Sequence, residues 1–481
     1  MIEARRLQSR FADGLIREEV QDLWEPWMRQ ADAILQDEAL LQLVYEALGQ
    51  RAPKSKTRGR RGTPAEQVLR LLVLKHARDW SFEVVVREVR ANLVYREFTR
   101  VGGDKVPDDK TLGRVARQLG PTVIEQIHQR LVAIAQQKKV VSGGKLRVDT
   151  TIVETNIHYP TDSSLMKDGV RVLTRVMKKA TAVTGEVKTQ VRDRTRSVKK
   201  SVIEIDRAAR NKTAKGQQKL KESYKKLLET TRRVVGQAKQ VVQEIAQGVQ
   251  PTAEKVAGVL QNAKRELESM IPRVQQVMRQ TRQRLFQGNT HAEEKIVSVF
   301  APETEIIRKG KASKPTEFGK LVKIQEAENQ IITHYEVFDQ RPSDSHLLVP
   351  SITQHQQQLG CVPKVVAADP GFFSAKNETA AADLGVRQVS VPQVGTKNRQ
   401  RRQRQKTRWF KKAQKWRAGG EGRISVLKRR HGLNRSLYKG PAGMKRWVGL
   451  GVIADTLINI GVHLEAAAVT VEVERGLASG I

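Results

Sequence analysis

The stretch KLRVDTTIVETN, residues 145–156, decides the fold class of this chain. Its β-branched residues and the two glycines before it predict a β-strand. An aspartate in the middle of a strand is unusual, because Asp is depleted there and a buried carboxylate is costly unless it binds a cation. Asp149 is therefore a candidate metal ligand on a β-sheet.

More strand patterns appear in the second half of the chain. KIVSVF, FGKLVKIQEA and NQIITHYEVFD predict strands, the last two as a hairpin, and SHLLVPSITQHQQQLG predicts a helix that ends at Gly360. The apolar run VVAA predicts a short buried strand that ends at Asp369, and RQVSVPQV predicts one more strand. This order of elements is the ribonuclease-H-like plan, an α/β fold: a strand with Asp, two strands, a helix, a strand with Asp, a strand and a helix with Glu.

The third acidic candidate follows the most basic part of the chain. Residues 397–417, KNRQRRQRQKTRWFKKAQKWR, include eleven basic residues and no acidic one, and Glu421 comes shortly after them. An isolated Glu beside arginines is usually a helix cap or an ion-pair partner, and that reading stays open at this point. Glu378 is the alternative third carboxylate. Four other acids are predicted to lie at the surface or in turns: Glu154, Asp162, Asp339 and Asp344.

Composition narrows the class of partner. The 481 residues have a formal charge of +36, with 87 Lys and Arg against 51 Asp and Glu, and such a field favours polyanions such as nucleic acid. The single cysteine, Cys361, excludes an internal disulfide framework and a Cys-rich zinc site. The start has no apolar signal segment. The late apolar stretch VGLGVIADTLINIGVHLEAAAVTV is interrupted by polar residues, and it predicts a buried helix followed by a strand or tail rather than a membrane span.

The N-terminal quarter of the chain predicts helices. RAPKSKTRGRRG, residues 51–62, is a basic arm, either a solvated linker or a segment that lies along phosphates. Short helices then follow up to Gly120, with plausible caps at Ser81 and at Asp108 or Asp109. This pattern predicts a helix-turn-helix type domain, and an ordinary helical bundle is the alternative.

Residues 163–288 predict a long helical block. Apolar residues alternate in steps of four and three from Leu220 to Ile245 and again from Val256 to Thr281, on either side of GVQPT. Two heptad helices around a Gly-Pro break predict an antiparallel coiled-coil hairpin. Its apolar seam is structural, and its basic flanks are candidate contacts to DNA.

From about residue 60 to about residue 460, the chain resembles a bacterial insertion-sequence transposase of the DDE class, of the ISNCY type. RRGTPAEQVLRLLVLKHARDW and VPDDKTLGRVARQL are similar to the DNA-binding region of that family. RVDTTIVETN and VVAADPGFFSAKNE resemble the strands with its two Asp residues, and RKGKASKPTEFGKLVKI resembles its stretch in which Phe-Gly precedes a basic strand. The last motif of the family has Arg, Glu and Lys at the spacing of Arg417, Glu421 and Lys428. Many relatives have a Tyr three residues before that Arg, where this chain has Gln414.

The resemblance implies a catalytic triad of Asp149, Asp369 and Glu421 that binds two Mg²⁺ ions, with Mn²⁺ as a substitute. It implies binding to the terminal inverted repeats of the element, cleavage at its ends and joining of the 3′ ends to target DNA, by a homodimer or higher oligomer. An inactive DNA-binding repressor and a stand-alone nuclease of the same fold are the alternatives.

The basic residues predicted to contact DNA come from the arm, the N-terminal helices, the basic run and the helix of Glu421: Arg58, Arg60, Arg61, Arg114, Arg117, Arg399, Arg401, Arg402, Arg404, Arg417, Arg423 and Lys428. The predicted location is the bacterial cytoplasm, at the nucleoid, without a membrane partner. The predicted domains are N-terminal helices (1–50), a helical DNA-binding domain with its arm (51–140), a catalytic domain (141–162 and 289–462), a helical insertion (163–288) and a tail (463–481).

Overall fold

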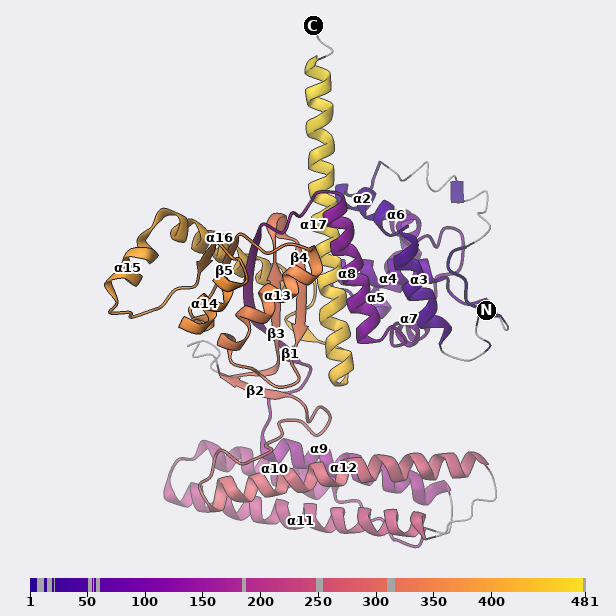
Figure 1. Ribbon diagram of the computed structural model, residues 1–481. Coiled ribbons are helices and arrows are strands. Elements are labelled where there is room, and N and C mark those ends of the chain that lie inside the picture. The colour runs from indigo at the N-terminus through magenta and orange to yellow at the C-terminus, as the bar shows by residue number, and fades with distance from the viewer. Residues whose placement is uncertain are drawn as a thin grey trace. The chain divides into compact units, whose positions relative to one another are not determined.

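The computed structural model describes residues 1–6, 13–14, 20, 22–50, 54, 56–57, 61–183, 187–247, 254–308 and 316–478 (Figure 1). The chain forms two compact units, one of Met1–Asn156 with Gly319–Ile481 and one of Ile157–Phe318. The second unit includes the helical insertion predicted at 163–288. Arg58, Arg60 and the GVQPT turn lie outside the described residues.

The N-terminal part of the first unit is helical, as the sequence predicts. Helix α5 begins after Ser81 and helix α7 after Asp108, and both side chains accept a hydrogen bond from a backbone N–H in the first turn. The helices are α2 (Pro26–Ile34), α3 (Glu38–Gly49), α4 (Ala65–Ala77), α5 (Phe82–Ala91), α6 (Leu93–Phe98), α7 (Asp109–Ala116) and α8 (Pro121–Gln137).

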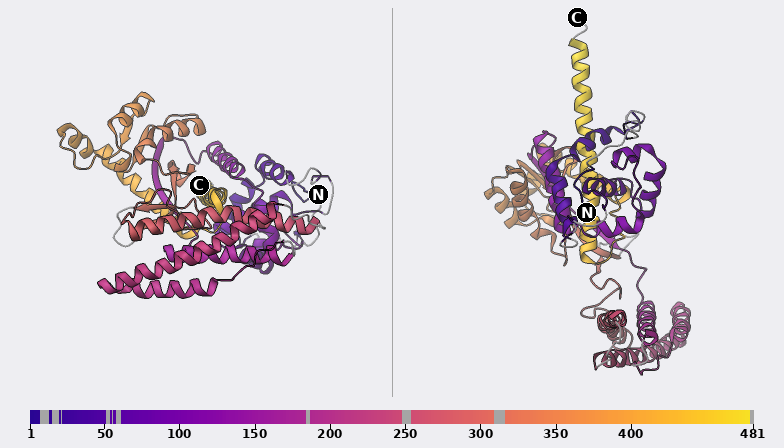
Figure 2. Two further views of the ribbon diagram at one scale, coloured as in Figure 1. Left: turned by 90° about the horizontal axis from the view of Figure 1, so that it is seen from below. Right: turned by 90° about the vertical axis from the view of Figure 1, so that its right-hand side faces the viewer.

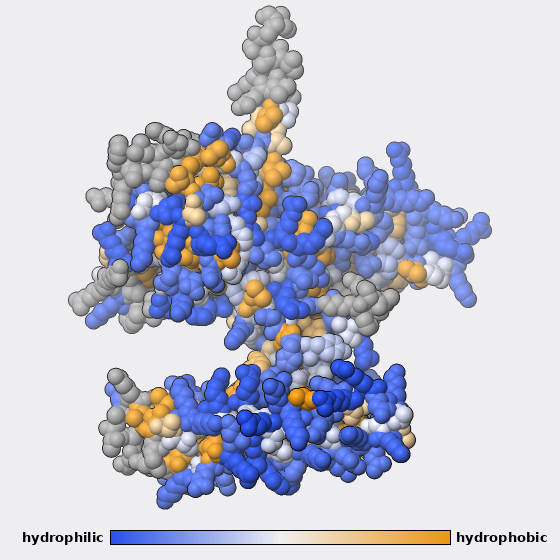
Figure 3. All heavy atoms as spheres, turned by 180° about the vertical axis from the view of Figure 1, so that it is seen from behind, coloured by the Kyte–Doolittle hydropathy of each residue, from blue (hydrophilic) through white to orange (hydrophobic). Residues whose placement is uncertain are grey.

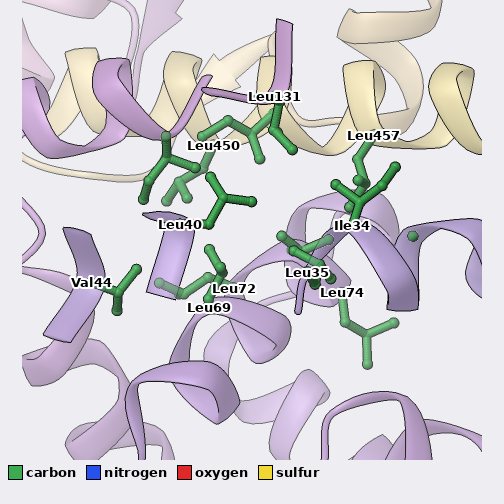
Figure 4. Close-up of a cluster of buried hydrophobic side chains, with 14 of the residues drawn as sticks. Ile34, Leu35, Leu40, Val44, Leu69, Leu72, Leu74, Leu131, Leu450 and Leu457 are labelled. Carbon is green, nitrogen blue, oxygen red and sulfur yellow. The ribbon is translucent and has the colours of Figure 1, made fainter. Parts of the chain in front are cut away.

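One apolar core joins these helices to the end of the chain. Leu450 and Leu457 of α17 (Gly440–Ala478) are buried in the same cluster as Leu40, Leu72 and Leu131 from α3, α4 and α8 (Figure 4). Because both segments need this shared core to bury their apolar faces, the boundaries predicted between the N-terminal domains and the catalytic domain do not separate compact units.

Helix α17 differs from the expectation for the C-terminal region. It continues through Ala478, where the sequence predicted a strand or tail from residue 463. Its part Gly440–Thr470 is long and apolar enough to cross a membrane, by length and composition only. Its most apolar window is 72% buried, and α17 packs against α2, α4 and α8, so it has the properties of a core helix.

The first unit also contains a mixed β-sheet of order β4-β3-β1-β5-β6 (Figure 1). β1 pairs antiparallel with β3, which pairs antiparallel with β4, whereas β1, β5 and β6 are parallel, and β7 pairs with the end of β1. The strands are β1 (Lys145–Thr155), β3 (Thr316–Glu326), β4 (Ile332–Val337), β5 (Val365–Ala368), β6 (Gln388–Ser390) and β7 (Arg435–Ser436). KIVSVF, residues 295–300, forms no strand, and β2 (Glu305–Arg308) follows it in the second unit.

Helices lie on both faces of this sheet. Leu146 and Val148 of β1 face an apolar cluster with α13 (Leu348–Leu359) and α14 (Ala375–Asp383). The other face is covered by α16 (Arg408–Arg430), which follows the short basic helix α15 (Arg399–Lys406). Side chains of a strand alternate between the faces, so Arg147 and Asp149 lie on the α16 side.

Strands β1 and β3 approach closely at Gly319, which faces Glu154 in the register. A Cβ on Gly319 would lie 2.1 Å from the carbonyl oxygen of Val153 and 2.8 Å from the Cα of Glu154. We expect Gly319→Ala to lower the free energy of unfolding by at least ~1–3 kcal/mol, because backbone atoms cannot move aside without disturbing the pairing.

The control for Gly319→Ala is the same substitution at Gly236 on helix α11 (Ala214–Ala246), where a Cβ would meet nothing within 4 Å. There, Gly→Ala is expected to stabilise by roughly 0.5–1 kcal/mol. Urea unfolding of both variants tests the close approach, and equal effects at the two glycines would contradict it.

The second unit is built from α9 (Asp162–Val183), α10 (Thr195–Arg210), α11 and α12 (Glu254–Phe286) (Figure 2). The heptad positions of both long helices are largely buried, among them Leu227, Val234, Leu267 and Val274. Their core also includes Val176 of α9 and further residues of α9 and α10. The seams are therefore buried in a core shared by four helices, and the two-helix coiled coil remains a prediction.

Candidate active site

The register of two parallel strands places the two candidate aspartates side by side. Val148 of β1 pairs with Ala368 of β5, so Asp149 and Asp369 are the next residues in register. The backbone of Asp369 is still extended, with φ −70° and ψ 157°, before the turn at Pro370–Phe372. Neighbouring strands lie about 4.8 Å apart and paired residues share a face, so both carboxylates lie at the same edge and face of the sheet.

Helix α16 is held on that face by Arg147. The guanidinium of Arg147 donates to Glu326 (Nε–Oε2 2.9 Å) and to the carbonyl oxygen of Trp416. Two glycines permit this close contact, because a Cβ on Gly419 would lie 2.9 Å from Nη1 of Arg147 and one on Gly420 3.3 Å from its Nε. The two glycines of the sequence AGGEG, Gly419 and Gly420, thus let the backbone before Glu421 lie against the side chain of Arg147.

Glu421 itself points into an ion pair. Its Oε1 accepts from Arg417 at 3.2 Å one helical turn earlier, and its side chain is 65% exposed. Within the described part of the chain, no group of three or more His, Cys, Asp or Glu residues is arranged to hold a metal ion. The adjacent Asp149 and Asp369 fit the oxygen chemistry of a hard divalent cation, whereas the third carboxylate is not gathered with them.

The alternative third carboxylate, Glu378 on α14, is already occupied. Arg401 donates to both of its oxygens at 2.6 and 2.7 Å. A metal site at Glu378 would have to break this ion pair, so the structure argues against the alternative.

Asp344 lies in the turn Asp344–His346, in agreement with the prediction of a surface or turn acid, and this turn is close to the ends of the strands. Its Oδ1 is 3.5 Å from Thr150 Oγ1, and its Oδ2 is 3.2 Å from the position of a Cβ on Gly371. Thr150 is on the opposite face of β1 from Asp149, so Asp344 approaches the aspartate pair from the α13 side rather than from the α16 side.

Two other acids expected at the surface are instead buried in ion pairs. Glu154 accepts from Arg435 at 2.9 Å, and Asp162 accepts from Arg284 at 2.7 Å. The sequence showed no partner for them because both arginines come from distant positions in the chain. Asp339 is exposed, as expected, and contacts Lys445 at 2.9 Å.

Two of the arginines predicted to contact DNA are buried. Arg401 binds Glu378 and the carbonyl oxygen of Val391, and Arg423 binds Asp455 (Nη2–Oδ1 3.1 Å). A phosphate contact at either residue would break a contact between the buried arginine and its acidic partner, which is costly. Arg417 and Lys428 are half-buried. The other described residues of the predicted set are exposed: Arg61, Arg114, Arg117, Arg399, Arg402 and Arg404.

A buried polar network under α16 was not found from the sequence. Arg423 Nη1 donates to Gln330 and to Asn459, each at 3.0 Å, and its guanidinium lies beside Asp455 of α17. Together with Arg147 and Glu326, these contacts connect β1, β3, α16 and α17. Arg147 was the one sign of this network in the sequence, because the alternation of side chains along a strand places it on the same face as Asp149.

Gln414 is at the position where many members of the transposase family that the sequence resembles have Tyr. Its Nε2 donates to Ser390 O at 2.6 Å and lies 3.5 Å from Ala368 O, at the ends of β6 and β5. The residue therefore fixes α16 to the carbonyl just before Asp369. Phe410 of the basic run is buried, so its ring is not available to stack on an unpaired base.

The pKa of Asp455 is raised to about 7, chiefly by burial, with Arg423 opposing the shift. The pKa of His431, which lies 3.5 Å away, is lowered to about 4 by burial, so their contact is a polar one and not a full ion pair near neutral pH. Between pH ~4 and ~7 the folded state retains a proton on Asp455 that the unfolded chain releases, so this residue makes the fold less stable as pH rises through that window.

We expect Asp455→Asn to remove that pH dependence. The free energy of unfolding of wild type minus that of the variant should fall by up to ~4 kcal/mol between pH 4 and 7.5. Urea unfolding at several pH values measures this difference, in which the buried histidines common to both proteins cancel. Parallel curves for the two proteins would contradict the expectation.

Comparison with known proteins identifies one region. Residues 26–118 match a family model described as a transposase domain (DUF772), which spans α2 to the end of α7. The match supports a transposase family, whose members are DNA-cutting enzymes. No curated protein and no solved structure matches the chain.

Proposed function

We propose that this protein is a transposase of the DDE class, which binds the terminal inverted repeats of its insertion sequence, cleaves the ends and joins the 3′ ends to target DNA. The observation that carries the proposal is the register of β1 and β5, because Asp149 and Asp369 directly follow the paired residues Val148 and Ala368. The transposase domain at residues 26–118 supports the same class.

The order of the elements also supports the proposal. The sheet has the succession expected for a ribonuclease-H-like catalytic domain: a strand with Asp, two antiparallel strands, a helix, a parallel strand with Asp, a further parallel strand and a helix with Glu. The second unit interrupts this succession between β1 and β3.

In the proposed reaction, Asp149 and Asp369 would hold divalent cations, Mg²⁺ or Mn²⁺, and Glu421 would join them when it leaves Arg417. Such ions activate the attacking oxygen and stabilise the leaving oxygen of an in-line phosphoryl transfer. Arg417, released from Glu421, and Lys428 lie on the same helix and would contact the phosphate backbone. Exposed arginines of α15 would position DNA without reading its bases.

Binding of the element ends is assigned to the transposase domain. Helix α7 exposes Arg114 with Arg117 just beyond it, as a helix that contacts DNA requires. Two DNA ends have to be held together for joining, so the proposed active form is a homodimer or a higher oligomer, at the nucleoid in the bacterial cytoplasm.

The test uses the full-length protein and duplexes taken from the DNA that flanks its own reading frame. We expect specific cuts at inverted repeats in Mg²⁺ and transfer of the cut ends to a plasmid. Binding to the repeats without a cut would favour a repressor, and cuts without transfer would favour a nuclease. An absence of binding and of cuts at any flanking sequence would refute the proposal.

A further inference from the structure

The second unit is strongly basic although it contributes none of the three candidate carboxylates. Residues 157–318 include 34 Lys and Arg against 17 Asp and Glu, a net charge of +17 out of +36 for the whole chain. The visible face of this unit is mostly hydrophilic (Figure 3). Charge of this size on one unit favours a polyanionic partner.

A groove between α11 and α12 gathers cations on both of its walls. It has a volume of about 360 Å³ and is lined by Arg232 and Val235 from α11 and by Gln275, Met278, Arg279 and Arg282 from α12. Gln275, Arg279 and Arg282 are spaced by four and three residues, so they share one face of α12. Three guanidinium groups therefore face one channel from two helices.

The acidic groups nearby do not balance these cations. Arg232 pairs with Glu229 at 3.0 Å, and the same carboxylate also pairs with Arg233 at 3.0 Å. Arg279 and Arg282 are exposed, and among the described residues neither has an acidic partner. The groove thus retains an excess of positive charge at neutral pH.

The row of cations continues along α11 beyond the groove. Lys225 lies two turns before Arg232, and its Nζ is 5.9 Å from the ring centre of Phe286 on α12. Lys221 precedes it by one turn and is also exposed. From Lys221 to Arg232 the helix rises about 16 Å, which is the length of roughly five phosphates along one strand of a duplex.

We propose that the groove between α11 and α12 binds the phosphate backbone of duplex DNA. The proposal rests on the proposed function, which supplies DNA as the substrate. Planar guanidinium forks on two walls suit phosphate oxygens, and the contacts do not depend on base sequence. The unit inserted in the catalytic domain thereby adds DNA contacts of its own.

The test compares two triple variants of the full-length protein with the same change in charge. Arg232→Gln/Arg279→Gln/Arg282→Gln removes the groove cations. Lys199→Gln/Lys200→Gln/Arg207→Gln removes three exposed cations from α10. The affinity of each protein for a random-sequence duplex is measured across a salt series.

We expect the groove variant to bind at least ~10-fold more weakly, with the slope of log affinity against log salt reduced by about 3, and the α10 variant to change by less than ~3-fold. Arg279→Lys/Arg282→Lys should retain most of the affinity and shows that the loss is due to charge in the groove. Equal losses in both triple variants would show a net-charge effect only. Unchanged DNA binding with impaired self-association of the groove variant would show a protein contact. Either result overturns the proposal.

A failure of the proposed function gives a different result. The Asp149→Asn protein should bind the duplex with wild-type affinity and salt dependence, whether or not the protein cuts DNA. An inactive wild type with a salt-sensitive groove would leave the groove proposal standing and remove the transposase reaction.

Discussion

Replacing Asp149 or Asp369 by Asn is expected to lower the rate of strand cleavage at least ~10³-fold, which corresponds to ~4 kcal/mol of transition-state stabilisation. Asp149 and Asp369 directly follow the paired residues Val148 and Ala368 of two parallel strands, so we expect each to supply half of one carboxylate pair. Asparagine retains the size of the side chain but loses the charge that holds a divalent cation. Binding to the terminal repeats should be unchanged, because the repeats are assigned to other residues.

Cleavage of a labelled end duplex in Mg²⁺, with binding measured on the same duplex, tests this expectation. Asp383→Asn is the matched control, because Asp383 is exposed at the end of α14. Cleavage by either aspartate variant at the rate of the control would refute the assignment.

The third carboxylate is decided by comparing Glu421→Gln with Asp344→Asn. Glu421 is on the helix that covers the face of Asp149, whereas Asp344 contacts Thr150 on the opposite face. We therefore expect Glu421→Gln to lose cleavage to the same degree as the aspartate variants and Asp344→Asn to retain it. The reverse result would assign the third ligand to Asp344.

The second large effect is expected on stability, at Arg147. Its guanidinium neutralises the buried Glu326 and binds the carbonyl oxygen of Trp416. Arg147→Met should lower the free energy of unfolding by ~3–5 kcal/mol, because it leaves a buried carboxylate without its partner. The double variant Arg147→Met/Glu326→Gln should recover much of the loss, since no unpaired charge remains.

Urea unfolding of wild type and both variants measures this effect. Burial raises the pKa of Glu326, with Arg147 opposing the shift. Without Arg147 this pKa should rise further, so the single variant should regain stability relative to wild type as pH falls and Glu326 becomes protonated. A double variant as unstable as Arg147→Met would show that the ion pair is not the cause.

Much of the secondary structure was predicted from local patterns. The β-branched run with Asp149 is strand β1, VVAA is strand β5 with Asp369 directly after it, and Ser81 and Asp108 cap their helices. Alternation of side chains and capping depend on residues a few positions apart, and these are visible in one sequence. KIVSVF failed as a strand because a short apolar run also occurs in irregular buried segments.

The candidate site was predicted only in its residue types. The strand predicted for Asp149, the strand predicted to end at Asp369 and the helix predicted for Glu421 are all present, and the register of β1 and β5 ends one residue before the two aspartates. The ion pair of Glu421 with Arg417 was one of the readings left open, because the spacing of two residues on a helix shows that their side chains can meet but not that they do.

Local patterns in the sequence predicted most of the helices and strands, and composition predicted the basic character of the chain. Only the tertiary structure decided which charges are buried: Arg401 with Glu378, Arg423 with Asp455 and Arg147 with Glu326. It also decided that α17 completes the core of the N-terminal helices. These ion pairs join residues 23 to 179 positions apart and the shared core joins residues farther apart still, so no local pattern shows which surfaces meet.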